Sequence, residues 1–487
     1  MNANLQNSNR GNFHGIAVVA PILLLPLALM GPNLLLGIYA CGALSIGIML
    51  LWRPSETPIL LFIFLYQWLQ AAMGPLYGNM FGLQIDELAP NNGQHALAGF
   101  LEITGVLSLA IGMRIAVGQP NTNLNERIRA FVSAKPLGFW LRLYVAASIF
   151  GAICGAVAWN AGGLQQPLLS LSQIKWAAYV MLTFATFSVP GKPKSIWLAV
   201  SGFEFVLAVG GYFSNFKDIF FYAIIAIVGC GLKLKPKELI FIFTAGLVLI
   251  CMGVVWSAVK IDYRDFVNGG SSEQIVSVNY PERMSELSRL IGDLDNQELT
   301  GGVEKLAHRT MYFEFFGAAI ANVPLNIPHT GGEIWGAAVL RSFMPRFIFS
   351  DKAPVHDSEL TRQYTGIRVS SYDQGTSISM GYMAEAYIDF GPILMFLPIT
   401  LLGCGLGFIY RWLVSAAGRD GVLGAALATF TLMPAYAIET SVLKLIPAVL
   451  LCVVACLVIL KFLAPLIWGV ERKPALIGSA RRRLADR

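Results

Sequence analysis

The sequence predicts an all-α polytopic membrane protein with about twelve transmembrane helices and one large loop outside the membrane. Only 13% of its 487 residues are charged and 55% are hydrophobic, whereas soluble domains carry about 25% charged residues. Several apolar stretches reach the roughly 18 residues that a helix needs to cross a bilayer. This composition excludes an ordinary soluble protein, a disordered chain and a nucleic-acid-binding protein.

Twelve apolar stretches form the predicted spans. Lipid offers the backbone no hydrogen-bond partners, so each span should be helical. The first is short and contains Pro21 and Pro26, and we interpret it as a retained span rather than a signal peptide. The spans are 16–31, 34–51, 58–74, 96–117, 137–160, 172–189, 195–213, 216–232, 239–259, 391–410, 421–437 and 445–467.

The positive charges between the spans predict the orientation of the chain. Of the 35 Lys and Arg residues, 21 lie in the two terminal segments and every second connection, whereas the alternate short loops hold only Lys175, Lys217 and Lys444. The positive-inside rule therefore places both termini in the cytoplasm. The long segment 261–390 is left out of this count because long loops cross regardless of charge, and parity places it outside.

The chain thus divides into four regions. Residues 1–260 hold nine spans, 261–390 form the large outer loop, 391–468 hold three spans, and 469–487 form a basic cytoplasmic tail. The loop contains 17 of the 29 Asp and Glu residues and three of the five histidines. Long loops are usually functional, so we expect the chemistry of this protein in that loop.

Hydrophobic periodicity predicts short helices within the loop. Residues 281–299 favour a surface helix, whereas the more apolar 303–322 favours an interfacial or re-entrant helix. A third helix is expected over 333–343. The polar segment 355–375 has the composition of a flexible lid or binding loop, and 375–391 leads into span ten with Glu385 and Asp389 on one face at the membrane surface.

Two segments of this loop resemble a known family. Residues 345–354, PRFIFSDKAP, resemble the PRxxxPDKP-like segment of the bacterial oligosaccharide repeat-unit polymerases, the Wzy-type O-antigen and exopolysaccharide polymerases. Residues 384–391, AEAYIDFG, look like the GEAYxNFG segment of that family, and Arg309 before an aromatic helix is also similar. The sequence departs from the pattern at Ser350, Ala384 and Asp389, where proline, glycine and asparagine are common.

The resemblance implies a glycosyltransferase of GT-C-like architecture in the bacterial inner membrane, with a periplasmic active site. Its donor would be an undecaprenyl-pyrophosphate-linked oligosaccharide, which it would polymerise into O-antigen or exopolysaccharide. Besides membrane lipid, a flippase and a chain-length regulator are the implied partners. We expect no metal or other cofactor, because arginines can offset the pyrophosphate charge. No Asp-x-Asp metal site for a nucleotide sugar is evident, and the cysteines lack zinc-type spacing.

This chemistry selects two groups of candidate residues in the loop. Arginines bind pyrophosphate oxygens in bidentate fashion and stabilise the leaving group, which points to Arg309, Arg341, Arg346 and Lys352; the alternative for each is an interfacial anchor. The attacking sugar hydroxyl needs a base, for which the candidates are Glu385, His356 and Asp357, or else these are surface or hydrogen-bonding residues. Sugar-binding or supporting positions are His308, Tyr312, Glu314, Arg362, Arg368, Tyr382, Tyr387 and Asp389.

Two other functions remain open at this point. A ligase or O-oligosaccharyltransferase would move the same lipid-linked glycan to lipid A or to a protein, and only the acceptor would differ. A flippase or transporter of lipid-linked oligosaccharide would also suit twelve spans. Transporters, however, usually carry their binding charges within spans arranged as two related halves. Here the charges concentrate in one loop, and the spans divide nine to three.

Overall fold

The protein is a bundle of helices. The structure, a computed structural model, describes residues 17–468 apart from 55, 122, 210, 212–214, 232–235, 272–275, 345, 347, 350, 351, 353, 354, 371–376 and 417–420. Part of the segment 345–354 and the predicted tail 469–487 therefore lie outside the described residues. Within the described part of the chain the regular structure is helical and no strand occurs.

The helices follow the order of the predicted spans and loop segments. A short helix, Ala17–Leu29, comes first. It is followed by α2 (Leu34–Leu51), α3 (Ile59–Phe81), α4 (His95–Val117), α5 (Leu124–Ser133), α6 (Leu137–Ala158), α7 (Gln165–Ser172), α8 (Lys175–Phe187), α9 (Ser195–Val209), α10 (Phe216–Gly229), α11 (Pro236–Val267), α12 (Tyr280–Gly292), α13 (Asn296–Thr310), α14 (Phe313–Asn322), α15 (Glu333–Ser342), α16 (Asp357–Thr365), α17 (Tyr382–Leu394), α18 (Phe396–Ala416), α19 (Val422–Leu432), α20 (Val442–Val458) and α21 (Ala464–Trp468).

Within the residues that the structure describes, eight helical segments are long and apolar enough to cross a membrane. They are Leu34–Leu51, Ile59–Phe81, His95–Val117, Leu137–Ala158, Gly162–Phe187, Phe243–Val267, Phe396–Ala416 and Val442–Leu463. The other four predicted spans correspond to shorter helices: Ala17–Leu29, α9, α10, and α19 with the 3₁₀ turn Met433–Ala435. The helical, multi-pass membrane character of the chain is thus confirmed at eight candidate spans.

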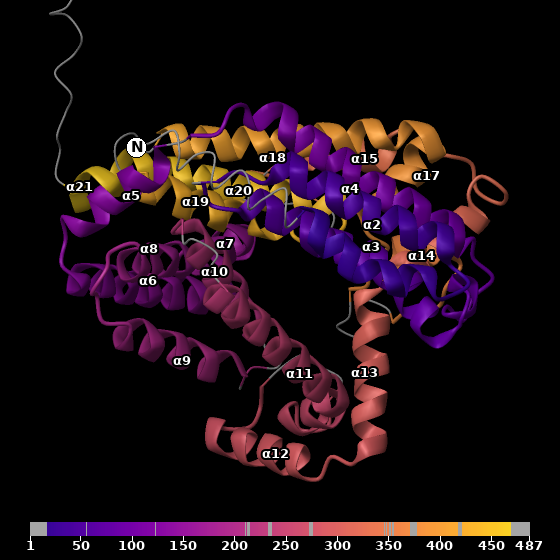
Figure 1. Cartoon of the computed structure of the whole chain (residues 1–487), viewed down its shortest axis with the longest axis horizontal. Coiled ribbons are helices and arrows are strands. Elements are labelled where there is room, and N and C mark those ends of the chain that lie inside the picture. The colour runs from indigo at the N-terminus through magenta and orange to yellow at the C-terminus, as the bar shows by residue number, and fades with distance from the viewer. Residues whose placement is uncertain are drawn as a thin grey trace, which may run out of the picture.

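The long helices run along one axis of the molecule, as Figure 1 shows for α2, α3, α4, α18 and α20. The helices α5 and α21 lie at one end of this bundle and α14 and α17 at the other, while α11, α12 and α13 extend from one side. Glycines let the helices α4 and α18 pack closely. A Cβ on Gly403 of α18 would lie 2.2 Å from the Leu109 carbonyl oxygen of α4, and a Cβ on Gly112 of α4 would lie 2.1 Å from the Thr400 carbonyl oxygen of α18. Such small residues let helices in lipid approach closely.

Two places in the helical bundle are interrupted by non-helical residues. The helix α19 ends in the 3₁₀ turn Met433–Ala435, and residues 436–441 are not helical before α20 begins at Val442. The helix α17 is interrupted at Gly391, which has φ 75°, with Pro392 next to it. The first interruption frees backbone groups that side chains from other helices must satisfy.

Candidate functional site

The segment 436–441 between α19 and α20 is held by two glutamines of α3. Gln67 donates to the Ala435 carbonyl oxygen at 2.9 Å. Gln70 accepts from the Ile438 N–H at 2.8 Å and donates to the Glu439 carboxylate. The backbone N–H of Tyr382, at the start of α17, lies 3.3 Å from the Ile438 carbonyl oxygen and 3.2 Å from that of Thr440. This polar segment is therefore fixed in position between α3 and α17.

Two cations, Lys217 and Arg309, lie near Tyr436 of this segment. Lys217 of α10 donates to the Tyr436 hydroxyl at 2.7 Å, and the Tyr436 ring packs against Tyr66 of α3 with centroids 4.7 Å apart. Arg309, at the end of α13, lies near enough for its charge to act on both tyrosine hydroxyls. Its side chain is exposed and forms no ion pair with any carboxylate in the described part of the chain.

Three further cations accompany Arg309 where α11 packs against α13. The charges of Arg309, Arg264 and Lys305 all act on Lys260. The two helices approach closely because Gly302 of α13 lies against the Val254 carbonyl oxygen, which a Cβ there would meet at 2.7 Å. We call Lys260, Arg264, Lys305 and Arg309 the α13 cation group. Four positive charges this close together repel one another, so an anion that binds among them is favoured.

Tyr312, which follows Arg309 in the chain after two residues, lies near a set of carboxylates. Its hydroxyl donates to the Ser379 carbonyl oxygen, just before α17. Burial raises the pKa of Tyr312 well above its usual range, and the charges of Glu439, Glu385, Asp357 and Glu102 add to the effect. The charges of carboxylates from the 436–441 segment and from α17, α16 and α4 thus all act on one half-buried tyrosine.

The two carboxylates of α17 both bind the start of another helix. Glu385 is buried, and its Oε2 accepts from the Val442 N–H at 2.7 Å, the first residue of α20. Asp389 is also buried and accepts from the Ile334 and Trp335 N–H groups of α15 at 3.1 and 2.8 Å. Helix N-termini favour anions. Both side chains therefore lie inside the protein, each at the start of a neighbouring helix.

Burial makes Glu385 a weak acid. It raises the pKa of this carboxyl to about 7, against the hydrogen bonds from Ser441 and Val442 that lower it, and Asp357 and Asp389 raise it further. The Glu385 side chain lies in α17, outside the eight candidate spans. This carboxyl therefore gains and loses its proton near neutral pH, as a general acid or base must.

Asp357 and His356 lie at the beginning of α16. The Asp357 carboxylate is 4% exposed, accepts from Lys444 of α20, and accepts from the Ser377 hydroxyl at 3.0 Å. Its other oxygen, Oδ1, is buried without a hydrogen-bond partner among the described residues. His356 precedes this helix and is half-buried. Asp357 thus anchors the predicted lid segment to α20.

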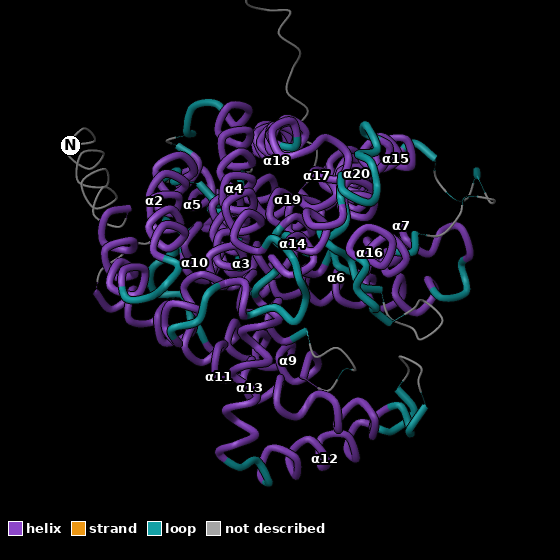
Figure 2. The backbone as a smooth tube through the Cα atoms, turned by 90° about the vertical axis from the view of Figure 1, so that its right-hand side faces the viewer, coloured by secondary structure: helices purple, strands orange, loops and turns teal. Residues whose placement is uncertain are grey.

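The structure separates Arg341, Arg346 and Lys352 from Arg309. Lys352 donates to the Arg341 and Met344 carbonyl oxygens at 2.6 and 2.8 Å, where it covers the end of α15. Burial lowers the pKa of Lys352, and the charges of Arg341 and Arg346 lower it further, so these three form a second group, the α15 cation group. In Figures 1 and 2 α15 and α13 lie on opposite sides of the bundle.

The remaining predicted positions are either structural or exposed. The Tyr382 hydroxyl donates to Gln67 at 2.8 Å and the Tyr387 hydroxyl donates to the Val323 carbonyl oxygen at 2.9 Å, so both are used inside the protein. Burial raises the pKa of Glu314, which lies near His308. The side chains of His308, Arg362 and Arg368 are exposed. No three His, Cys, Asp or Glu side chains in the described ranges are grouped as metal ligands.

Sequence reasoning missed the charged and polar residues around Tyr436 and Arg309. Glu439, Tyr436, Lys217 and Lys260 all lie within or beside apolar stretches that were interpreted as spans. Charged residues in such stretches are costly and usually functional, so an isolated Lys260 near the end of span nine was a usable signal. The pairing of Glu439 with Gln70 had no such signal, because 369 residues separate them.

Comparison with known proteins gives no relative. No family model matches the chain, and no curated protein or solved structure shows significant similarity to it.

Proposed function

We propose that this protein is a glycosyltransferase that polymerises polyprenyl-pyrophosphate-linked oligosaccharide repeat units at the outer face of the bacterial inner membrane. One observation carries the proposal. The charges of Glu439 and of Arg309, a member of the α13 cation group, both act on Tyr436 in the non-helical segment 436–441, within a bundle of membrane helices. An anionic leaving group and a hydroxyl nucleophile need this combination of charges.

The proposed reaction is a displacement at the anomeric carbon of the donor sugar. Arg309 and Lys260 bind the pyrophosphate of the donor. The acceptor hydroxyl attacks the anomeric carbon, a new glycosidic C–O bond forms, the bond to the pyrophosphate oxygen breaks, and polyprenyl pyrophosphate leaves with the electron pair. Glu439 accepts the proton of the hydroxyl. The cations stabilise the charge that grows on the leaving group.

Two carboxylates are available for the role of base, and we assign it to Glu439. The side chain of Glu439 is partly exposed and lies beside Tyr436, which Arg309 also approaches. Glu385 is 1% exposed and one of its oxygens already binds the start of α20. We therefore assign Glu385 to positioning: through Ser441 and Val442 it fixes the segment that carries Glu439.

The second cation group supports a polymerase over the alternatives. A polymerase joins two substrates that each carry a lipid pyrophosphate, whereas a transfer to protein uses one. The α13 and α15 cation groups offer two separate anion sites. The α15 group also adjoins apolar side chains that are exposed, among them Leu340, Phe343 and Ile348, which suit the lipid chain of a substrate.

Reconstitution tests the proposal directly. The purified protein in liposomes is incubated with lipid-linked repeat units, and the products are separated by size while released polyprenyl pyrophosphate is measured. We expect a ladder of polymers with one polyprenyl pyrophosphate released for each linkage. Movement of intact substrate across the bilayer without new linkages would identify a flippase instead. Transfer of single units to an added protein or lipid A would identify a ligase.

A further inference from the structure

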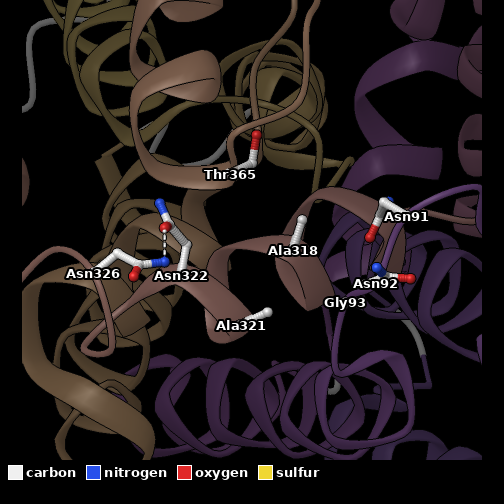
Figure 3. Close-up of a pocket in the computed structure, with 8 residues that line it drawn as sticks. All are labelled: Asn91, Asn92, Gly93, Ala318, Ala321, Asn322, Asn326 and Thr365. Carbon is white, nitrogen blue, oxygen red and sulfur yellow. Dashed lines mark hydrogen bonds between the residues drawn. The ribbon is translucent and has the colours of Figure 1, made fainter.

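A cavity of about 220 Å³ opens between three segments at the end of the molecule that carries α14 and α16. Figure 3 shows its lining: Asn91 and Asn92 from the turn before α4, Asn322 and Asn326 at the end of α14, and Thr365 at the end of α16. None of its lining side chains is ionisable. The cavity thus offers amide and hydroxyl groups without charge.

The segments around this cavity are fixed before any ligand arrives. The turn before α4 is joined to α14 by a hydrogen bond from the Gln94 N–H to the Gly317 carbonyl oxygen at 2.9 Å. Gly93 allows this approach, because a Cβ there would lie 2.7 Å from the backbone of Gly317. Asn322 donates to the Tyr364 carbonyl oxygen at 2.9 Å and thereby joins α14 to α16.

Some of the amide groups that line the cavity remain free to bind a ligand. Asn326 uses its amide N–H to bind Asn322 Oδ1 at 2.9 Å, and its own Oδ1 has no partner among the described residues. Asn92 is exposed, and its side chain makes no hydrogen bond within the described part of the chain. Amides both donate and accept, as the hydroxyl groups of sugars do.

We propose that this cavity binds a neutral part of the oligosaccharide chain, a subsite that holds the glycan while its end reacts. This inference rests on the proposed function. The helix α14 connects the two places: it follows Arg309 and Tyr312 and ends at Asn322 after 10 residues, a rise of about 15 Å. A short oligosaccharide spans that distance. The hydrogen-bonded amide of Asn322 and the unused amide oxygen of Asn326 favour ligands that carry many hydroxyl groups. Because these groups are uncharged, they favour neither an anion nor a cation.

A panel of immobilised neutral bacterial oligosaccharides tests the inference without any need for polymerase activity. The purified protein in detergent should bind at least one of them, and the double variant Asn92→Ala/Asn326→Ala should bind it about tenfold or more weakly, as expected for two lost hydrogen bonds. Ala321→Trp, which fills the cavity from α14, should also remove binding. Asn296→Ala, on the exposed surface of α13, is the matched control and should bind normally.

The possible results separate this inference from the proposed function. Equal binding by the double variant, or no binding of any neutral glycan by the wild type, overturns the subsite even if the protein polymerises repeat units. Glycan binding that the cavity variants abolish, in a protein that forms no glycosidic bond, keeps the subsite and removes the polymerase. Unchanged unfolding temperatures confirm that the variants are folded.

Discussion

Glu439 belongs to the non-helical segment 436–441 and Glu385 binds the residue that follows it, and their hydrogen bonds predict different responses to mutation. Glu439→Gln keeps the size of the side chain but removes its basicity, so we expect polymer formation to slow by about 10²–10⁴-fold. Glu385→Gln still accepts from the Val442 N–H, so it should keep most of the activity, whereas Glu385→Ala should lose it. Initial rates in the reconstituted system measure all three. A loss in Glu385→Gln as large as that in Glu439→Gln would make Glu385 the base.

The buried carboxyl of Glu385 also predicts a pH dependence of stability. Its pKa is raised from 4.5 to about 7 in the folded protein, so between these values the folded state binds more protons than the unfolded state. Stability should therefore fall as pH rises from about 4.5 to about 7 and level off above that. Thermal unfolding in detergent across this range should show the fall, and Glu385→Gln should reduce it. An identical pH profile in the variant would contradict the raised pKa.

Of the predicted pyrophosphate ligands, Arg309 is the one that lies beside the non-helical segment 436–441. We expect Arg309→Ala to reduce the rate by a factor that corresponds to about 2–4 kcal/mol, by analogy with the loss of an oxyanion donor. Arg309→Lys should recover only part of it, because lysine lacks the planar fork of donors. Arg289→Ala on α12, which breaks an exposed ion pair with Glu286, is the control. Normal polymerisation by Arg309→Ala at normal protein level would remove this residue from the site.

At the scale of helices, the packing of α13 on α11 sets where Arg309 lies. The chain supplies its own control here, because Gly301 has open space around it whereas Gly302 lies against the Val254 carbonyl oxygen. Gly302→Ala should push α13 away from α11 and lower polymerase activity. Gly301→Ala should leave activity unchanged and stabilise the helix by up to about 1 kcal/mol. Activity and unfolding temperature, measured on both variants, test the pair. Equal activity in both would mean that the α11–α13 contact does not position the site.

Local patterns predicted the helices but not how they combine. Long apolar runs predicted α2 and α4 to within one residue, because hydrophobicity and length alone decide whether a segment suits lipid. The helix α3 continues to Phe81, beyond the predicted end at residue 74. The spacing of Glu385 and Asp389 indicated one helix face, yet their partners, the N-termini of α20 and α15, come from distant parts of the chain. The grouping of Arg309 with Lys260, and its separation from Arg341, likewise depend on helix packing, which no local pattern encodes.

For the whole molecule, the predicted orientation requires that every second connection between spans lies at the same end of the helical bundle. They do so in one place: the Gly118 carbonyl oxygen, in the segment after α4, accepts from Arg53 at 2.8 Å and from Arg114 at 3.0 Å. Gly118 also lies beside Arg411 at the end of α18, since a Cβ there would meet that guanidinium at 3.2 Å. Three positively charged segments that the sequence assigns to the same side of the membrane thus converge at one end of the bundle, and the side of the membrane that this end faces stays a prediction.

Cysteine labelling tests this orientation. In a variant without the seven native cysteines, Thr300→Cys on α13 should react with a membrane-impermeant maleimide added to intact spheroplasts, because the long loop is predicted to be periplasmic. Ser133→Cys, exposed at the end of α5, should react only after the membrane is permeabilised, because the segment between α4 and α6 is predicted to be cytoplasmic. Labelling of Ser133→Cys alone in intact spheroplasts would reverse the orientation. It would also place the α13 cation group and Glu439 on the wrong side for a periplasmic polymerase, so this result decides the function as well as the topology.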